Sequence, residues 1–283
     1  MSSKIIVSFF WFFLIVSALS AHDKIVSLTP SITKILFHLN LENDIIGVTD
    51  YCEFQGKVKK LVEEGKIKRV SGFNAINYEK ILLINPDIIL GMDSISMESK
   101  KNLDKLFKNK KIYWFRHPRN FEEIKKQIIE IGKVVKKEDK SLEMVNFIEK
   151  ELKIVENKVK NIPDNLKPKI LVEIHYPPFT TAGINTFVSD IILKAGGRLA
   201  LNIKDDWANI SMEDIFAASP DIIVKSRLTE NNHNLDAIEA YKKNRIFIPS
   251  NVDFILQPGV ENVFAVKELY DYIINLGRLT KPK

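Results

Sequence analysis

The sequence predicts an α/β protein of two related lobes that are joined by one long helix. Short β-branched runs alternate with segments of helical period, and this alternation indicates βα units with mostly parallel sheets. Residues 140–159 keep a helical period without Gly or Pro. A motif of 18 residues occurs once on each side of that segment, which favours two lobes of one design.

The first residues have the three parts of a secretory signal, namely a positive charge at Lys4, an apolar run at residues 5–16 and small residues at 17–21. The run is shorter than the about 20 residues of a transmembrane helix, although an uncleaved anchor remains the alternative. We expect cleavage after Ser20. No cysteine ends the apolar run, so we expect no lipid anchor and a mature protein free in the periplasm.

Composition narrows the class of protein further. Cys52 is the only cysteine, so no internal disulfide forms, and 45% hydrophobic residues supply a core. The net charge of +6 comes from lysines interleaved with acids, which indicates a solvated surface rather than a nucleic-acid partner. We expect a monomer.

Each lobe is predicted from its own series of strands and helices. In the N-terminal part, strands are expected at residues 24–28, 45–49, 87–90 and 112–115, and helices at 31–39, 78–84, 97–107 and 121–135. In the C-terminal part, strands are expected at 169–174, 221–225 and 245–249, and helices at 186–195, 212–218 and 259–276.

The uninterrupted segment 140–159 predicts a helix of roughly 30 Å, which is long enough to join the two lobes. Pro163 closes it. The predicted domains are therefore a signal peptide at 1–20, an N-terminal lobe at 21–138, a linking helix at 139–163 and a C-terminal lobe at 164–283.

The repeated motif aligns residues 73–90 with residues 207–224 at an offset of 134. Both copies begin with an aromatic residue, place a glutamate six residues later (Glu79 and Glu213) and end in Pro-Asp-Ile-Ile. Two independent helix–Pro–Asp–strand turns would explain the Pro-Asp pair, because Pro stops a helix and Asp suits a turn. They would not explain the matched glutamates and aromatics, so we favour two related lobes.

Two interpretations of Glu79 and Glu213 follow from the helix caps before them, Asn77 and Ser211. Carboxylates in a first helical turn interact well with the helix dipole, which is reason enough for acids there. Alternatively, one matched carboxylate per lobe presents a paired docking surface to a symmetric partner.

Aromatic residues fall in loops that follow predicted strands. Such loops edge the crevice at the carboxyl ends of parallel strands, where ligands bind. These rings favour a large, flat, mostly apolar ligand. They are Tyr51, Phe73, Phe179 and Trp207.

Catalytic and metal-binding patterns are absent from the sequence. It contains no G-x-S-x-G, H-E-x-x-H, C-x-x-C or Walker motif, and its five histidines are scattered. We therefore expect a binding protein rather than an enzyme, with no metal site and no cofactor of its own.

Several blocks resemble the helical-backbone (class III) periplasmic binding proteins of ABC importers for vitamin B12, ferric siderophores and haem, and most of all the members that bind vitamin B12 (cobalamin). The blocks are residues 25–33, 46–51, both copies of the repeat, 177–183 and 195–197. The resemblance covers nearly all of the mature chain. It implies two Rossmann-like lobes, a stiff linking helix and a ligand between the lobes.

The resemblance also implies roles for particular residues. It makes Glu79 and Glu213 the contacts for arginines on the membrane permease dimer. The residues that match corrinoid-contacting positions are Tyr51, Phe73, Phe179, Trp207 and Asp253. Met92 stands where the family has a tryptophan. Residues 257–261 lack an arginine, which disfavours a strongly anionic ferric siderophore.

The expected function is capture of a corrinoid and its delivery to an ABC importer. A haem or ferric-siderophore carrier of the same class is the nearest alternative. An exported α/β hydrolase or transferase would need a nucleophile–base pair that the sequence does not reveal. A scaffold of two lobes would not need an aromatic cleft.

Overall fold

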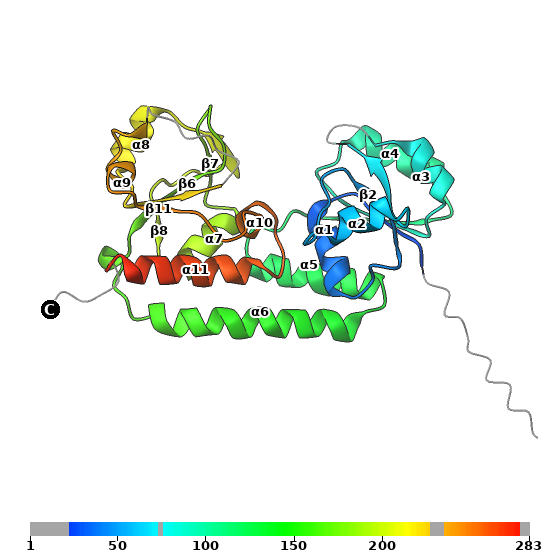
Figure 1. Cartoon of the computed structure of the whole chain (residues 1–283), viewed down its shortest axis with the longest axis horizontal. Helices are drawn as coiled ribbons and strands as arrows, with labels where there is room; N and C mark the ends of the chain where they lie inside the picture. Colours follow the sequence, from blue (N-terminus) through cyan, green and yellow to red (C-terminus); the bar gives the residue numbers. More distant parts are fainter. Residues whose placement is uncertain (1–22, 73–75, 227–234, 278–283) are drawn as a thin grey trace, which may run out of the picture.

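The computed structural model describes residues 23–72, 76–226 and 235–277. The predicted signal segment and Phe73 lie outside these ranges. Figure 1 shows two α/β lobes side by side above one long helix, α6 (Glu138–Val159). The predicted fold class is confirmed. None of the helices that the structure describes is both long and apolar enough to cross a membrane.

The N-terminal lobe is a doubly wound sheet with the parallel strand order β3-β2-β1-β4-β5 in the described residues. The strands are β1 (Ile25–Ser27), β2 (Ile45–Thr49), β3 (Lys68–Ser71), β4 (Ile88–Met92) and β5 (Lys111–Phe115). The helices are α1 (Pro30–His38), α2 (Lys57–Glu63), α3 (Tyr78–Ile84), α4 (Met97–Leu106) and α5 (Phe121–Val134). Both faces of the sheet are buried, since Ile25 and Val26 of β1 belong to different apolar clusters.

The C-terminal lobe is built on a parallel sheet of order β11-β10-β6-β8 with a separate antiparallel pair, β7 and β9. Its strands are β6 (Lys169–Glu173), β7 (Thr180–Ala182), β8 (Arg198–Leu199), β9 (Trp207–Asn209), β10 (Ile222–Lys225) and β11 (Ile246–Phe247). Its helices are α7 (Phe187–Lys194), α8 (Met212–Ala218), α9 (Glu239–Lys242), α10 (Asp253–Leu256) and α11 (Asn262–Asn275), and a 3-10 turn spans Asp164–Leu166.

The linking helix α6 runs beneath both lobes (Figure 1). Its 22 residues correspond to about 33 Å. Val145, Ile148 and Val155 are buried on its inner face and belong to one apolar cluster that includes strand residues of both lobes. Because the core is continuous from lobe to lobe, α6 is packed along its length rather than suspended as a free tether.

The repeated motif builds the same unit twice. The carboxylate of Asp87 accepts a hydrogen bond at 2.9 Å from the backbone N–H of Lys24, the residue before β1. The carboxylate of Asp221 accepts one at 2.9 Å from the N–H of Lys169, at the start of β6. Each aspartate therefore ties its own strand to the strand beside it, which is more than a turn-forming role.

Some elements differ from the sequence prediction. The predicted helix at 259–276 begins only at Asn262, because its side-chain oxygen accepts from the N–H of Gly259 at 2.6 Å and its amide donates to Phe254 and Gln257. This bonding holds residues 259–261 as a turn. The sequence analysis did not predict β3, β7, β8, β9, α2, α9 and α10.

Candidate functional site

Two neighbouring cavities lie between the lobes and share Ser94 and His117. In a doubly wound sheet, the crevice opens at the carboxyl ends of the strands where the strand order reverses, here between β1 and β4. The cavities follow this rule. They are lined after β1 by Thr29, after β2 by Tyr51, after β3 by Gly72, after β4 by Ser94 and after β5 by His117.

The first cavity, the aromatic cleft, has a volume of about 800 Å³. Tyr51 of the N-terminal lobe and Trp207 of the C-terminal lobe both line it, and they are 58% and 41% exposed. Ile95 and Leu256 add apolar surface from each lobe. The structure thus brings two of the predicted ligand-binding residues to one cleft, and their contact with a ligand stays a prediction.

Phe179 lies elsewhere. Its ring is only 3% exposed and belongs to an apolar cluster with Ile215 of α8 and Ile223 of β10. Thr180 donates its N–H to the carbonyl of His175, so the segment folds back on itself and turns the ring inward. In this structure the ring is part of the core and not of the cleft wall, in contrast to the sequence prediction.

Asp253 also lies outside both cavities. Its carboxylate is 2.7 Å from the Nζ atom of Lys34 on α1, so it joins the two lobes. One turn further along α1, His38 Nε2 is 2.7 Å from Glu261 Oε1. Burial tends to raise the pKa of Glu261, but the hydrogen bond and charge of His38 outweigh it and leave this pKa below its ordinary value. These contacts fix α1 against the segment around α10.

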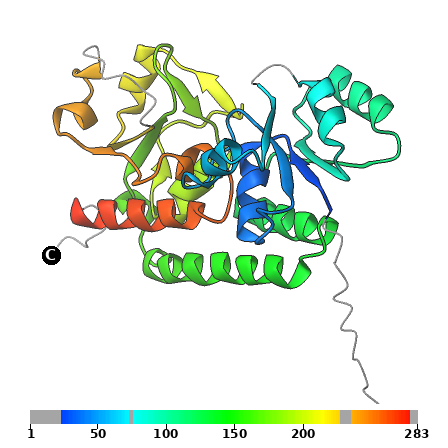
Figure 2. The same cartoon turned by 45° about the vertical axis from the view of Figure 1, so that its right-hand side comes forward.

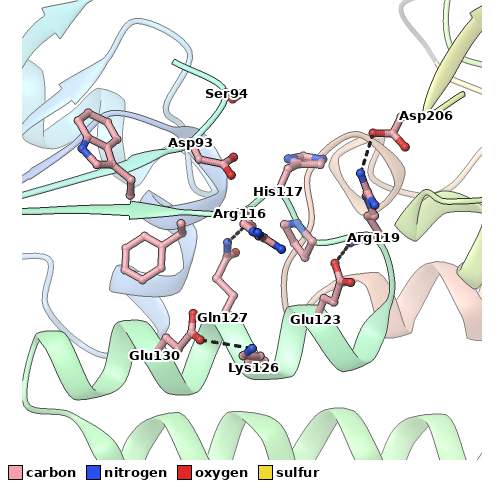
Figure 3. A pocket seen from close by; sticks show the side chains of 13 residues that line it. Asp93, Ser94, Arg116, His117, Arg119, Glu123, Lys126, Gln127, Glu130 and Asp206 are labelled. Carbon is pink, nitrogen blue, oxygen red and sulfur yellow. Dashed lines mark hydrogen bonds and ion pairs between the residues drawn. The ribbon is translucent and has the colours of Figure 1, made fainter. Parts of the chain in front are cut away.

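The second cavity, the polar pocket, has a volume of about 840 Å³ and is lined from both lobes (Figure 3). Arg116 and Arg119 lie on the segment between β5 and α5. The Nη2 atom of Arg119 is 3.7 Å from the Oδ2 atom of Asp206 in the other lobe. The side chain of Gln127 on α5 donates to the carbonyl of Arg116 at 2.8 Å. The lining of the pocket thus carries both acidic and basic side chains.

His117 lies at the boundary of the aromatic cleft and the polar pocket. Its ring meets Phe187 edge-on at 6.2 Å between centroids. Desolvation by the surrounding protein lowers the pKa of His117, and the charges of Asp206 and Asp93 oppose that shift only in part. This shift favours the neutral imidazole, although the residue is exposed. The sequence analysis missed Arg116 and His117, although the strand-end rule, applied to the predicted strand at 112–115, could have found them.

The described residues contain no group of three or more His, Cys, Asp or Glu that is suited to hold a metal ion. Cys52 is buried, and desolvation raises the pKa of its thiol, which keeps it in the unreactive form.

Glu79 and Glu213 are exposed in the first turns of α3 and α8. Other side chains cap these helices. Asn77 accepts from the N–H of Lys80 at 2.9 Å, and Asp214 completes a capping box with Ser211. Both views place α3 and α8 on the side of the molecule away from α6 (Figures 1 and 2).

Two lobes on a helical backbone, with a ligand-sized cleft between them, define a solute-binding protein. Residues 25–270 match the periplasmic binding protein family, and the chain belongs to that family. The family's members are solute-binding proteins of ABC transporters.

Relatives of known name share most of the chain's length. It is 28% identical over 258 residues to an ABC transporter substrate-binding lipoprotein of Bacillus subtilis, covering 88% of this chain and 79% of the relative. It is 23% identical over 262 residues to the vitamin B12-binding protein of Photorhabdus laumondii, covering 92% and 91%. Among solved structures, the periplasmic haem-binding protein BhuT has a TM-score of 0.74 at 17% identity, covering 89% and 99%, which shows a shared fold.

Proposed function

We propose that this protein captures a corrinoid such as cobalamin between its lobes in the periplasm and delivers it to an ABC importer. It acts as a monomer after removal of the signal segment, and it works by binding alone, without catalysis and without a resident cofactor. The family supports the role of a solute-binding protein for an ABC transporter. The choice of ligand depends on the site.

One observation carries that choice: the aromatic cleft adjoins a pocket of balanced charge. A corrinoid has a flat macrocycle and a rim of neutral amide side chains. Tyr51 and Trp207 offer rings for the flat face. The amide rim needs both donors and acceptors, which Arg116, Gln127 and Asp93 supply together.

The charges of the polar pocket argue against a strongly anionic ligand. Its lining carries three basic side chains, Arg116, Arg119 and Lys126. Its four acidic side chains are Asp93, Glu123, Glu130 and Asp206. Ferric siderophores with high negative charge, and the carboxylates of haem, call for an excess of cationic partners.

Haem is nevertheless the second candidate, because a specific residue favours it. His117 presents a neutral imidazole beside the aromatic cleft, and a neutral imidazole is a good axial ligand for iron. The test must therefore compare both ligands.

Delivery requires contact with the permease. We propose that Glu79 and Glu213, exposed residues of two helices that lie on the same side of the molecule, bind arginines of the permease dimer. Because Asn77 and Asp214 take part in the caps, neither glutamate is needed to complete them.

Replacing Trp207 with Ala tests the ligand site. Calorimetric titration with cyanocobalamin should show affinity at least about tenfold lower than wild type, because a ring contact contributes roughly 0.5–1.5 kcal/mol beyond its buried area. The matched control is Phe147→Ala, a similarly exposed ring (37%) on α6 away from the cleft, which should leave affinity unchanged. Wild-type affinity in Trp207→Ala would remove the cleft assignment.

A further inference from the structure

The repeat carries a second matched feature on its outer face. Leu82 and Phe216 are equivalent at the offset of 134 and are 45% and 49% exposed. Each follows its glutamate by three residues. Positions i and i+3 are neighbours on one helical face, so each lobe presents a carboxylate beside an apolar side chain.

Leu82 and Phe216 do not belong to the hydrophobic core of their lobes. Their immediate neighbours Ile81 and Ile215 are fully buried, so the inner faces of α3 and α8 are already filled. The outer face of a surface helix is ordinarily polar. Leu83, next to Leu82, is 84% exposed and enlarges the apolar surface on the N-terminal lobe.

We propose that Leu82 and Phe216 are apolar anchors of a two-point docking surface, formed with Glu79 and Glu213, for a two-fold symmetric membrane partner. Each half of that partner presents a cationic group beside an apolar pocket. The inference rests on the proposed function and adds to it the residues that hold the complex together. Charges at a rim govern encounter and register, whereas buried apolar anchors supply most of the binding energy.

The positions of α3 and α8 favour a two-fold symmetric partner over a small ligand. The helices that carry the two acid–apolar pairs, α3 and α8, belong to different lobes and lie on the same side of the molecule, away from α6 (Figures 1 and 2). A small ligand cannot reach both pairs. A partner that uses both must span the lobes and offer the same chemistry twice, which a two-fold dimer does. Negative charge at both points requires positive charge on the partner.

The experiment measures saturable binding of purified protein to membrane vesicles from source cells that lack this chain. Three double variants are compared with wild type: Leu82→Ala/Phe216→Ala, Glu79→Gln/Glu213→Gln, and the control Leu142→Ala/Leu193→Ala. The control removes two leucines that are 53% and 51% exposed on α6 and α7. We expect at least about tenfold weaker binding for Leu82→Ala/Phe216→Ala, a smaller loss for Glu79→Gln/Glu213→Gln and no change for the control. All three should keep wild-type affinity for cyanocobalamin.

Each result decides between the proposals. Wild-type vesicle binding by Leu82→Ala/Phe216→Ala, with loss in the glutamate variant, would overturn the anchors and leave charge-based docking. Wild-type vesicle binding by both double variants would overturn both the apolar anchors and the charge-based docking. Absence of saturable binding by the wild-type protein would contradict the importer role itself. Dimers in sedimentation velocity that the leucine–phenylalanine variant abolishes would assign the surface to a second copy of the chain instead.

Discussion

The two lobes are alike on the side away from α6 and different at the cleft. Both carry the same helix–strand unit, α3–β4 and α8–β10, with an aspartate that ties neighbouring strands together. At the cleft, the N-terminal lobe contributes the loops after all five strands of its sheet, whereas the C-terminal lobe contributes mainly Trp207, Asp206 and residues 256–257. A symmetric surface suits a symmetric partner, and an asymmetric cleft suits a ligand whose two faces differ.

The largest expected effect on stability is at Phe179, which was predicted to line the cleft and lies in the core instead. Phe179→Ala removes a ring that is 3% exposed, so it should lower the free energy of unfolding by about 3–5 kcal/mol. Denaturant titration measures this loss. Trp207→Ala, at a ring 41% exposed, should change stability far less. Similar stability losses in the two variants would contradict the division into core ring and cleft ring.

The two equivalent aspartates of the repeat, Asp87 and Asp221, should contribute unequally to the stability of the fold. Asp221→Ala leaves the partly buried N–H of Lys169 without its acceptor and should cost about 1–3 kcal/mol of unfolding free energy. Asp87→Ala should cost less, because Lys24 is exposed and water replaces the lost acceptor. Equal losses in thermal and denaturant unfolding would show that the two units are energetically equivalent.

The smallest effect concerns the contact between the lobes. Because the folded pKa of Glu261 lies below its ordinary value of 4.5, its stabilisation is present above that value and is lost as pH falls through the folded pKa. Glu261→Gln should therefore lower the free energy of unfolding by about 1–2 kcal/mol at pH 6. The difference from wild type should shrink as the pH falls below 4.5 and through the folded pKa. A difference that stays constant over this range would exclude the carboxylate as its source.

Local patterns predicted the parts of the fold that local interactions determine. The linking helix was predicted at 140–159 and is observed at Glu138–Val159, because its apolar spacing and the later Pro163 set its limits. The repeat was visible because both copies need the same buried isoleucine and the same aspartate. The strand-end rule predicted Tyr51 at the crevice, and Tyr51 lines the aromatic cleft.

The positions of Asp253 and Phe179 depend on long-range contacts that the sequence pattern does not reveal. Asp253 pairs with Lys34, which is 219 residues away, and no local pattern reveals that partner. Phe179 and Tyr51 both follow strands. The chain folds back at residues 175–180 and buries the ring of Phe179, whereas the ring of Tyr51 stays exposed. The strand β8, which was not predicted, has only two residues, too few for a recognisable alternation.

The central claim is that the cleft between the lobes binds a corrinoid. Purified protein is mixed separately with cyanocobalamin, haem and a ferric siderophore, desalted, and examined by visible absorbance. The account predicts that the cyanocobalamin spectrum alone remains with the protein at a ratio near one to one, and that Trp207→Ala retains less. Retention of haem or the siderophore, with complete loss of cyanocobalamin, would contradict it.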